Sequence, residues 1–263
     1  MLNMSYGKAI SYEKQGTIGV LDFVNEEKHN VIGEMFFDEL EEIEAEISKD
    51  YELRALLIIS EGRIFSSGID LDGLKEAGSE TLKKILVRYQ RLFNFFQEIP
   101  IPVVCGIQGK CFGSGVELAL ACDIRVCDEA GKLSMPEGRF GLSPDIGGTT
   151  RLTKLVGTGW AKFMLMTGMP VKGKDAVNIG LCQMAVPSDM VQMAALQIAT
   201  EISNLPPMSM RFIKRGVNLA DEASVHAGMY FEEAQSIYCC GTEDLKEAIS
   251  AFLEKREAFF KGF

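Results

Sequence analysis

The sequence predicts an α/β core followed by a helical C-terminal region, and two observations support this. Strand-like and helix-like patterns alternate over the first 135 residues, whereas the chain beyond about residue 148 is patterned mainly as helices. The 263 residues suffice for one large domain or two small ones, with a core that needs no disulfide or metal. Because the proline-containing stretch 204–207 interrupts the helical pattern, we expect a core over 1–200 and a helical region over 201–263.

Short apolar runs rich in β-forming residues predict the strands, and apolar residues at helical spacing predict the helices. The stretch 61–73 contains glycine and serine and is expected to be a loop. In chain order, the expected strands are 16–23, 54–60, 102–107, 123–127 and 132–135. The expected helices are 34–48, 79–98, one that begins near residue 114, and then 148–156, 159–168, 173–180, 188–204, 207–219, 222–238 and 242–260.

Composition and charge narrow the classes of partner. The 27 Lys and Arg residues stand against 37 Asp and Glu residues, and the resulting net charge of −10 argues against nucleic acid as the main partner. An anionic substrate would then have to be held by a local basic patch or by backbone N–H groups. No apolar run reaches the roughly 18 residues of a membrane helix, and the N-terminus lacks the apolar segment of a signal peptide. We therefore expect a cytoplasmic protein without a membrane contact.

The cysteines and histidines agree with this expectation. The seven cysteines form no C-x-x-C pair and lie mostly in apolar runs, which predicts buried free thiols in a reducing compartment. The adjacent Cys239 and Cys240 are expected to pack in the core rather than form a redox pair. Only two histidines are present, His29 and His226, so the chain offers few ligands for a zinc site. We expect no metal.

Two loops that follow predicted strands carry small residues, at 65–70 and 109–115. Such loops let a ligand approach backbone N–H groups closely, and the second loop opens a helix, whose first turn has unpaired N–H groups. Two donors of this kind, brought together, could hold one carbonyl oxygen as negative charge develops on it.

Two carboxylates flank the segment that follows the second loop. Glu117 lies one turn into the predicted helix, and Glu137 follows Pro136 at the end of a strand pattern. If the intervening strand returns the chain, both carboxylates face one cavity and could act as general acid and general base. Two structural interpretations stay open: the spacing Ser114-x-x-Glu117 is that of a capping box, and Glu137 could be a solvated loop carboxylate.

Four segments together resemble the crotonase superfamily, also called the enoyl-CoA hydratase/isomerase superfamily. They are RIFSSGIDL (63–71), IPVVCGIQGKCFGSGVELALACDIRV (101–126), LSMPEGRFGLSPDIGGTTRL (133–152) and AFLEKREAFFKG (251–262). The resemblance covers nearly the whole chain and implies a crotonase-like spiral of ββα units. It also implies an acyl-CoA thioester substrate, a homotrimer or homohexamer, and a trimerisation role for 201–263. Coenzyme A is part of the substrate in this family, so no separate cofactor is expected.

The resemblance assigns roles to individual residues. The backbone N–H groups of Ile69 and Ser114 correspond to the oxyanion hole, and Glu117 and Glu137 correspond to the two glutamates of the hydratases. Residues expected to bind the substrate or its CoA portion are Ser67, Gly68, Ile69, Asp70, Leu71, Asp72, Gly113 and Lys261. Lys261 corresponds to a basic residue that meets CoA phosphates in some members, often from a neighbouring subunit.

The implied activity is hydration of the 2,3 double bond of a trans-2-enoyl-CoA. Asp145 favours a second interpretation, because isomerases of the superfamily place a catalytic Asp where many hydratases have glycine. A third carboxylate would permit an enoyl-CoA or dienoyl-CoA isomerase that moves a proton between carbons without adding water. The alternative for Asp145 is a loop-cap residue after proline. A non-catalytic RNA-binding or scaffold member is a remote alternative, which the net charge opposes.

Overall fold

The computed structural model describes residues 9–76 and 78–263, and its larger sheet has six strands in the order β1-β2-β3-β5-β7-β10. β1 pairs antiparallel with β2, and the other neighbours pair in parallel. Parallel strands buried on both faces are apolar throughout, which explains the runs in β3 and β5. The strands are β1 (Ile10–Gln15), β2 (Ile18–Phe23), β3 (Ala55–Ser60), β5 (Val103–Ile107), β7 (Ile124–Asp128) and β10 (Met184–Val186).

A smaller sheet of four short strands lies beyond the first, in the order β4-β6-β8-β9. Its strands are β4 (Ile64–Ser66), β6 (Lys110–Phe112), β8 (Lys132–Ser134) and β9 (Val171–Lys172). The chain passes from β3 to β4, from β5 to β6 and from β7 to β8, so each step adds one parallel strand to each sheet. Helices follow these strand pairs, and the ββα units that the resemblance implies are therefore present.

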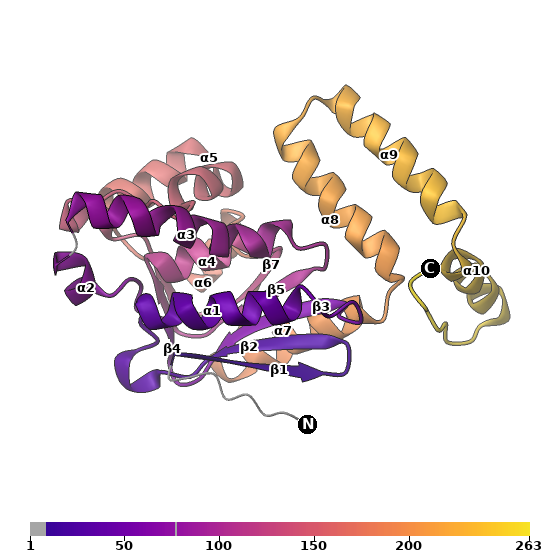
Figure 1. The fold of residues 1–263 in the computed structure, drawn as a ribbon, viewed down its shortest axis with the longest axis horizontal. Coiled ribbons are helices and arrows are strands. Elements are labelled where there is room, and N and C mark those ends of the chain that lie inside the picture. The colour runs from indigo at the N-terminus through magenta and orange to yellow at the C-terminus, as the bar shows by residue number, and fades with distance from the viewer. Residues whose placement is uncertain (1–8, 77) are drawn as a thin grey trace.

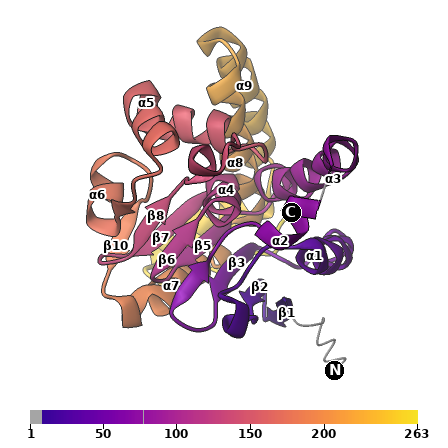
Figure 2. The same ribbon diagram turned by 90° about the vertical axis from the view of Figure 1, so that its left-hand side faces the viewer.

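Helices cover both faces of the larger sheet. On one face α1 and α3 pack on side chains such as Leu56 and Ile58, while α7 packs on the alternate side chains, such as Leu57. Figure 2 shows α4 near the centre of the molecule, between α1 and α3 on one side and α5 and α6 on the other. These helices are α1 (Glu34–Ile47), α2 (Leu71–Glu76), α3 (Ser79–Glu98), α4 (Ser114–Ala121), α5 (Gly148–Thr167), α6 (Gly173–Asn178) and α7 (Val191–Ser203). Three 3₁₀ turns are η1 (Glu26–Lys28), η2 (Glu137–Phe140) and η3 (Ser188–Met190).

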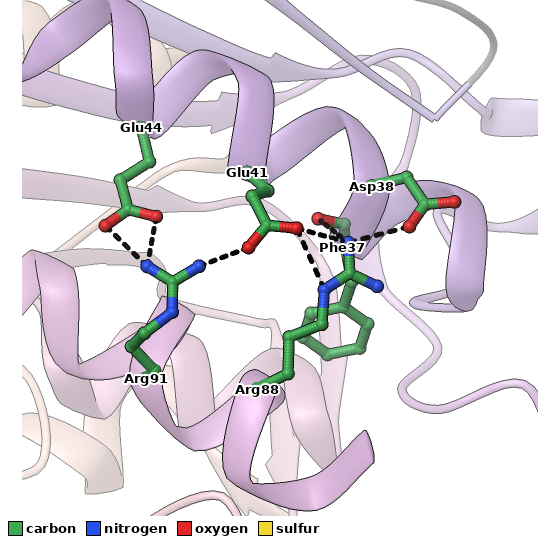
Figure 3. Close-up of polar contacts among 6 residues, drawn as sticks. All are labelled: Phe37, Asp38, Glu41, Glu44, Arg88 and Arg91. Carbon is green, nitrogen blue, oxygen red and sulfur yellow. Dashed lines mark hydrogen bonds and ion pairs between the residues drawn. The ribbon is translucent and has the colours of Figure 1, made fainter. Parts of the chain in front are cut away.

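Charged side chains join α1 to α3 along the surface (Figure 3). Arg88 pairs with Asp38 and Glu41, each at 2.7 Å. Arg91 pairs with Glu41 and Glu44, each at 2.5 Å. Because single exposed ion pairs contribute less than about 1 kcal/mol, this network mainly orients α3 over α1, and the buried aromatic contacts beneath it provide more of the stability.

Three helices at the C-terminal end extend away from the two sheets (Figure 1). They are α8 (Pro207–Glu222), α9 (Val225–Cys240) and α10 (Glu243–Glu254), and α9 has no buried residue within the chain. The anchor of this arm is the ammonium of Lys214 on α8. It donates to Phe96 O (2.8 Å) and Ile101 O (3.0 Å) and pairs with Asp123 at 2.8 Å.

Most predicted elements are confirmed, and the helix over 79–98 has the predicted bounds. The predicted loop at 61–73 is wrong in part, because it contains β4 and the start of α2. The two helices expected at 148–156 and 159–168 are the halves of α5, which breaks at Gly157 (φ 74°). The last predicted helix ends at Glu254 rather than near residue 260, and the next residue adopts a left-handed conformation.

The cysteine prediction is confirmed for five residues and wrong for two. The cysteines at 105, 111, 122, 127 and 182 are buried free thiols. Cys239 is partly exposed and Cys240 is exposed, because α9 turns no face toward the core.

We expect Lys214→Ala to lower the free energy of unfolding by about 3 kcal/mol, because it leaves a half-buried carboxylate and two carbonyls without their cation. Lys154→Ala is the matched control: Lys154 joins α5 to Asp221 of α8 through an exposed pair at 2.7 Å, and its loss should change the value by less than about 1 kcal/mol. Urea unfolding measures both. Equal effects would contradict the anchoring role of Lys214.

Candidate active site

A cavity of about 390 Å³ opens between α2, α3, the start of α4 and the segment 137–146. Its apolar wall includes Leu74 of α2 and Leu82, Ile85 and Leu86 of α3. The opposite wall is polar and contains Ser114, Glu117, Glu137 and Asp145. An apolar pocket with a few convergent polar groups is the usual form of a small-molecule site.

Two neighbouring turns of the backbone bring Ile69 and Ser114 to the lining of this cavity. Gly68 and Gly113 lie against each other at the ends of β4 and β6, and both have positive φ, 94° and 51°. A Cβ atom on Gly68 would lie 2.8 Å from the carbonyl oxygen of Phe112, so only glycine permits this approach. The residues that follow the two glycines are Ile69 and Ser114.

The hydrogen bonds around Ile69 leave its N–H group free. Ile32 N donates to Gly68 O at 2.8 Å, and Asp70 N donates to Ile32 O at 2.9 Å, so the N–H of Ile69 faces away from Ile32. Ser114 is the first residue of α4, where N–H groups lack intrahelical acceptors. Within 9–76 and 78–263, neither N–H group has an acceptor. Both are therefore available to a ligand oxygen.

Glu117 lies in α4, all of whose residues are buried. Its Oε1 accepts hydrogen bonds from Ile146 N and Gly148 N, both at 2.9 Å. The capping-box interpretation is therefore wrong, since Gly113 caps α4 without a side-chain bond and Glu117 reaches across to another loop. Burial raises the pKa of Glu117 to about 7, with smaller upward contributions from Glu137 and Asp145, while the two amides oppose the rise.

Glu137 begins η2, and its carboxylate lies beside the start of α4. A Cβ atom on Gly113 would lie 3.1 Å from Glu137 Oε1. Oε2 is buried, with no hydrogen-bond partner among the described residues. The solvated interpretation is therefore wrong. Burial raises the pKa of Glu137, and the charge of Asp145 raises it further.

Asp145 lines the same cavity from the loop that precedes α5. Gln90 of α3 donates from Nε2 to the carbonyl oxygen of Asp145 at 2.6 Å, and burial raises the pKa of the Asp145 carboxyl. The Asp145 carboxyl does not cap α5, because Gly147 is the N-cap of that helix and no side chain contributes a capping bond there. The three predicted carboxylates thus face one space.

Of the predicted CoA-binding segment from Ser67 to Asp72, Ile69 and Asp70 line the cavity. Ser67 is exposed, and its N–H donates to His29 O at 3.0 Å. Asp70 accepts from Asp72 N at 3.1 Å and so begins α2. Leu71 is 47% exposed, and Asp72 is also exposed. The segment offers both apolar contact and unburied polar groups to a ligand that enters here.

Lys261 is not brought to this cavity within one chain. It follows α10 in the C-terminal segment, and its N–H donates to Asp244 Oδ1 at 2.7 Å. In Figure 1 this end of the molecule lies on the opposite side from α2. Any contact of Lys261 with a ligand in such a cavity would involve a second copy of the chain.

Sequence analysis missed several residues of the site. Tyr89 lines the cavity and stacks on Phe37, with ring centroids 3.4 Å apart and planes 6° apart. Tyr89 belongs to the apolar stripe of α3, and this pattern could have indicated that its side chain faces inward. The backbone N–H groups that bind Glu117 could not be predicted in this way, because a backbone donor does not depend on the type of residue that carries it. The pair Gly147-Gly148 was the available hint of an unusual helix start.

Residues 9–76 and 78–263 contain no group of three or more His, Cys, Asp or Glu side chains that could hold a metal ion. No helix within those residues is long and apolar enough to cross a membrane.

The buried carboxyl of Glu117 predicts a pH-dependent gain in stability for Glu117→Gln. The pKa is about 7 in the folded protein and 4.5 ordinarily, so the folded state binds this proton more tightly. Its stabilising contribution is complete below pH 4.5 and is lost as the pH rises through 7. The unfolding free energy of the variant minus that of the wild type should rise over this range by up to about 3 kcal/mol. Urea unfolding at a series of pH values measures it, and a flat difference would contradict the prediction.

Known proteins resemble this chain over most of its length. The chain matches the enoyl-CoA hydratase/isomerase family over residues 13–262. A short-chain-enoyl-CoA hydratase of Clostridium acetobutylicum is 29% identical over 252 residues, which cover 95% of this chain and 96% of the relative. The mitochondrial Delta(3,5)-Delta(2,4)-dienoyl-CoA isomerase of Homo sapiens is 30% identical over 243 residues, covering 88% of this chain and 74% of the relative.

Solved structures extend the match to the whole architecture. An enoyl-CoA hydratase from Bacillus anthracis superimposes with a TM-score of 0.92 at 27% identity, covering 97% of this chain and 99% of that one. A putative enoyl-CoA hydratase from Streptomyces coelicolor gives a TM-score of 0.93 at 26% identity, covering 99% and 96%. Because the family match spans nearly the whole sequence, the chain belongs to the enoyl-CoA hydratase/isomerase family and has the crotonase fold.

Proposed function

We propose that this protein is an enoyl-CoA hydratase that adds water across the 2,3 double bond of a trans-2-enoyl-CoA. The observation that carries the proposal is a shared cavity: the carboxyl groups of Glu117 and Glu137 face the same space as the start of α4, where Ser114 offers a free N–H group. A base, an acid and an oxyanion site in one pocket are the groups that such an addition requires.

In this proposal the thioester oxygen accepts hydrogen bonds from the N–H groups of Ile69 and Ser114. These bonds strengthen as negative charge develops on that oxygen, so they favour the enolate over the starting thioester. The acyl chain lies against the apolar wall of α3, and the CoA portion leaves along Ser67–Asp72. Coenzyme A enters as part of the substrate, and we assign no separate cofactor.

The proton transfers divide between the two glutamates. Glu117 orients a water molecule and accepts a proton from it as the water oxygen bonds to the β-carbon. Glu137 delivers a proton to the α-carbon, so that one hydroxyl and one hydrogen are added in total. Burial raises the pKa of both carboxyls, so the pair can provide one protonated and one ionised group, as an acid and a base require.

Isomerisation is the second candidate, and Asp145 is the observation that favours it. Its carboxyl faces the same cavity, so a proton removed from one carbon could be returned to another without addition of water. The similarity to the human dienoyl-CoA isomerase supports isomerisation, in the same way that the similarity to hydratases supports hydration.

We further propose that the chain assembles as a homotrimer or as a homohexamer made of two trimers. Exposed apolar side chains on the C-terminal arm support this, among them Tyr230 and Ile237 of α9 and Phe252 of α10, which is 82% exposed. Such an assembly would let Lys261 approach a neighbouring subunit's cavity. A net charge of −10 argues against the remote alternative, an RNA-binding or scaffold protein.

An absorbance assay with crotonyl-CoA tests the hydratase proposal. We expect the wild type to remove the absorbance of the conjugated enoyl thioester, and Glu117→Gln and Glu137→Gln each to lower kcat by at least 10²-fold, in line with the usual contribution of general acid–base catalysis. Asp145→Asn is the matched carboxyl-to-amide control and should retain hydratase activity. No absorbance loss with the wild type would refute short-chain hydration.

A 3,5-dienoyl-CoA in the same assay tests the second candidate. Formation of the 2,4-conjugated product by the wild type, with a loss of at least 10²-fold in Asp145→Asn, would assign Asp145 to isomerisation. Unchanged rates in Asp145→Asn would remove it from the chemistry.

Deleting one N–H group tests the oxyanion site. Proline is tolerated at the first position of a helix but lacks the N–H, so Ser114→Pro removes the proposed donor and keeps the helix start. We expect kcat to fall by about 10²–10³-fold. Ser114→Ala keeps the N–H and should stay within a few-fold of the wild type. Circular dichroism confirms that both variants are folded, and equal activity in the two would contradict the assignment.

A further inference from the structure

Arg151 lies on α5, one turn after the helix begins, and its half-buried guanidinium binds three neutral acceptors. Nη1 donates to Ile146 O at 3.2 Å, Nε donates to Gln97 Oε1 at 2.8 Å, and Nη2 donates to Asn94 Oδ1. Partly removing a cation from water without a bonded carboxylate costs free energy, which these three hydrogen bonds offset in part.

The guanidinium acts on the residue that holds Glu117. Ile146 donates its N–H to Glu117 Oε1 and accepts from Arg151 through its carbonyl, so the residue is fixed on both sides. A Cβ atom on Gly147 would lie 2.0 Å from Arg151 Nη1, which shows how closely the guanidinium packs on this loop. Gly148, the next residue, is the second donor to Glu117.

α3 supports the same loop from outside. Gln90, Asn94 and Gln97 lie at intervals of four and three residues and so share one face of the helix. Gln90 binds the carbonyl of Asp145, while Asn94 and Gln97 bind Arg151. The loop is thus clamped between α3 and Arg151 on one side and Glu117 on the other.

We propose that Arg151 is a positioning residue for Glu117: by binding the carbonyl of Ile146 it aims the N–H groups of Ile146 and Gly148 at the Glu117 carboxylate. The kinetic test of this inference rests on the function proposed above, whereas the hydrogen bonds that position Glu117 do not depend on that function. The charged groups that face Glu117 are Glu137 of η2, Asp145 of the loop and Arg151 of α5. Two of them oppose its ionisation, and Arg151 favours it.

The test combines kinetics with a direct titration of Glu117. We expect Arg151→Gln to lower kcat/KM with crotonyl-CoA by about 10–100-fold, because displaced catalytic groups cost rate on that order. The acidic limb of the pH profile should move to higher pH, since the cation is lost. Carbon-13 NMR of glutamate-labelled protein, with the Glu117 signal assigned by its absence in Glu117→Gln, should show its titration midpoint above that of the wild type.

Two further variants separate positioning from simple stability. Arg151→Lys keeps the charge but loses the planar fork, so kcat/KM should fall while the Glu117 midpoint stays closer to that of the wild type. Lys154→Gln removes a cation three residues further along α5 and should change neither readout.

The outcomes distinguish this inference from the proposed function. A lower melting temperature in both Arg151 variants, with kcat/KM and the Glu117 midpoint unchanged, would overturn the positioning role. If the wild type acts on no enoyl-CoA, the proposed function fails, and the NMR midpoint in Arg151→Gln still decides the inference. If Arg151→Gln does not fold, Arg151→Lys provides the same two measurements, and an unchanged kcat/KM there would overturn the positioning role.

Discussion

The site depends on the burial of one carboxylate, that of Glu117, inside a helix with no exposed residue. An isolated carboxylate in such surroundings would cost several kcal/mol, so hydrogen-bond donors must come to it. The donors are the amides of Ile146 and Gly148, which stand 29 and 31 residues further along the chain. Because Gly148 is the first residue of α5 and Ile146 precedes its N-cap, satisfying Glu117 also helps to set where α5 starts. Asp145 precedes them directly and is carried to the cavity by the same contact.

The smaller sheet imposes a second constraint on the same helix. β4 and β6 are parallel neighbours, and each ends near a glycine with positive φ, so Gly68 and Gly113 can lie in contact. Ser114 follows Gly113 and also begins α4, whose fourth residue is Glu117. One short helix therefore presents a backbone donor at its first residue and a carboxylate one turn later. Their relative position follows from helix geometry rather than from loop flexibility.

The sequence predicted those parts whose signal is local. α3 has twenty residues with a regular apolar stripe, and β3 and β5 consist almost entirely of apolar residues. Patterns of this length and regularity distinguish a helix or a buried strand from a loop. β4 and β6 have three residues each, too few to show a period, and they were missed. Glu117 and Glu137 were found through their residue type and motif. The donors to Glu117 and the grip of Arg151 were not, because contacts between distant segments decide them.

Three carboxyl groups around one cavity constrain the chemistry whichever reaction proceeds. Burial raises the pKa of Glu117, Glu137 and Asp145, and the charge of Asp145 opposes ionisation of both glutamates, so the cluster gives up its protons less readily than separate carboxylates would. Hydration and isomerisation both need one base and one acid at the same moment, and a shared proton provides that pair without a histidine. The two reactions then differ in whether a water molecule adds to the β-carbon and in which carboxyl exchanges a proton with which carbon. Asp145 leaves both reactions open to this chain, because the hydrogen bonds to Glu117 already hold the loop of Asp145 at the cavity.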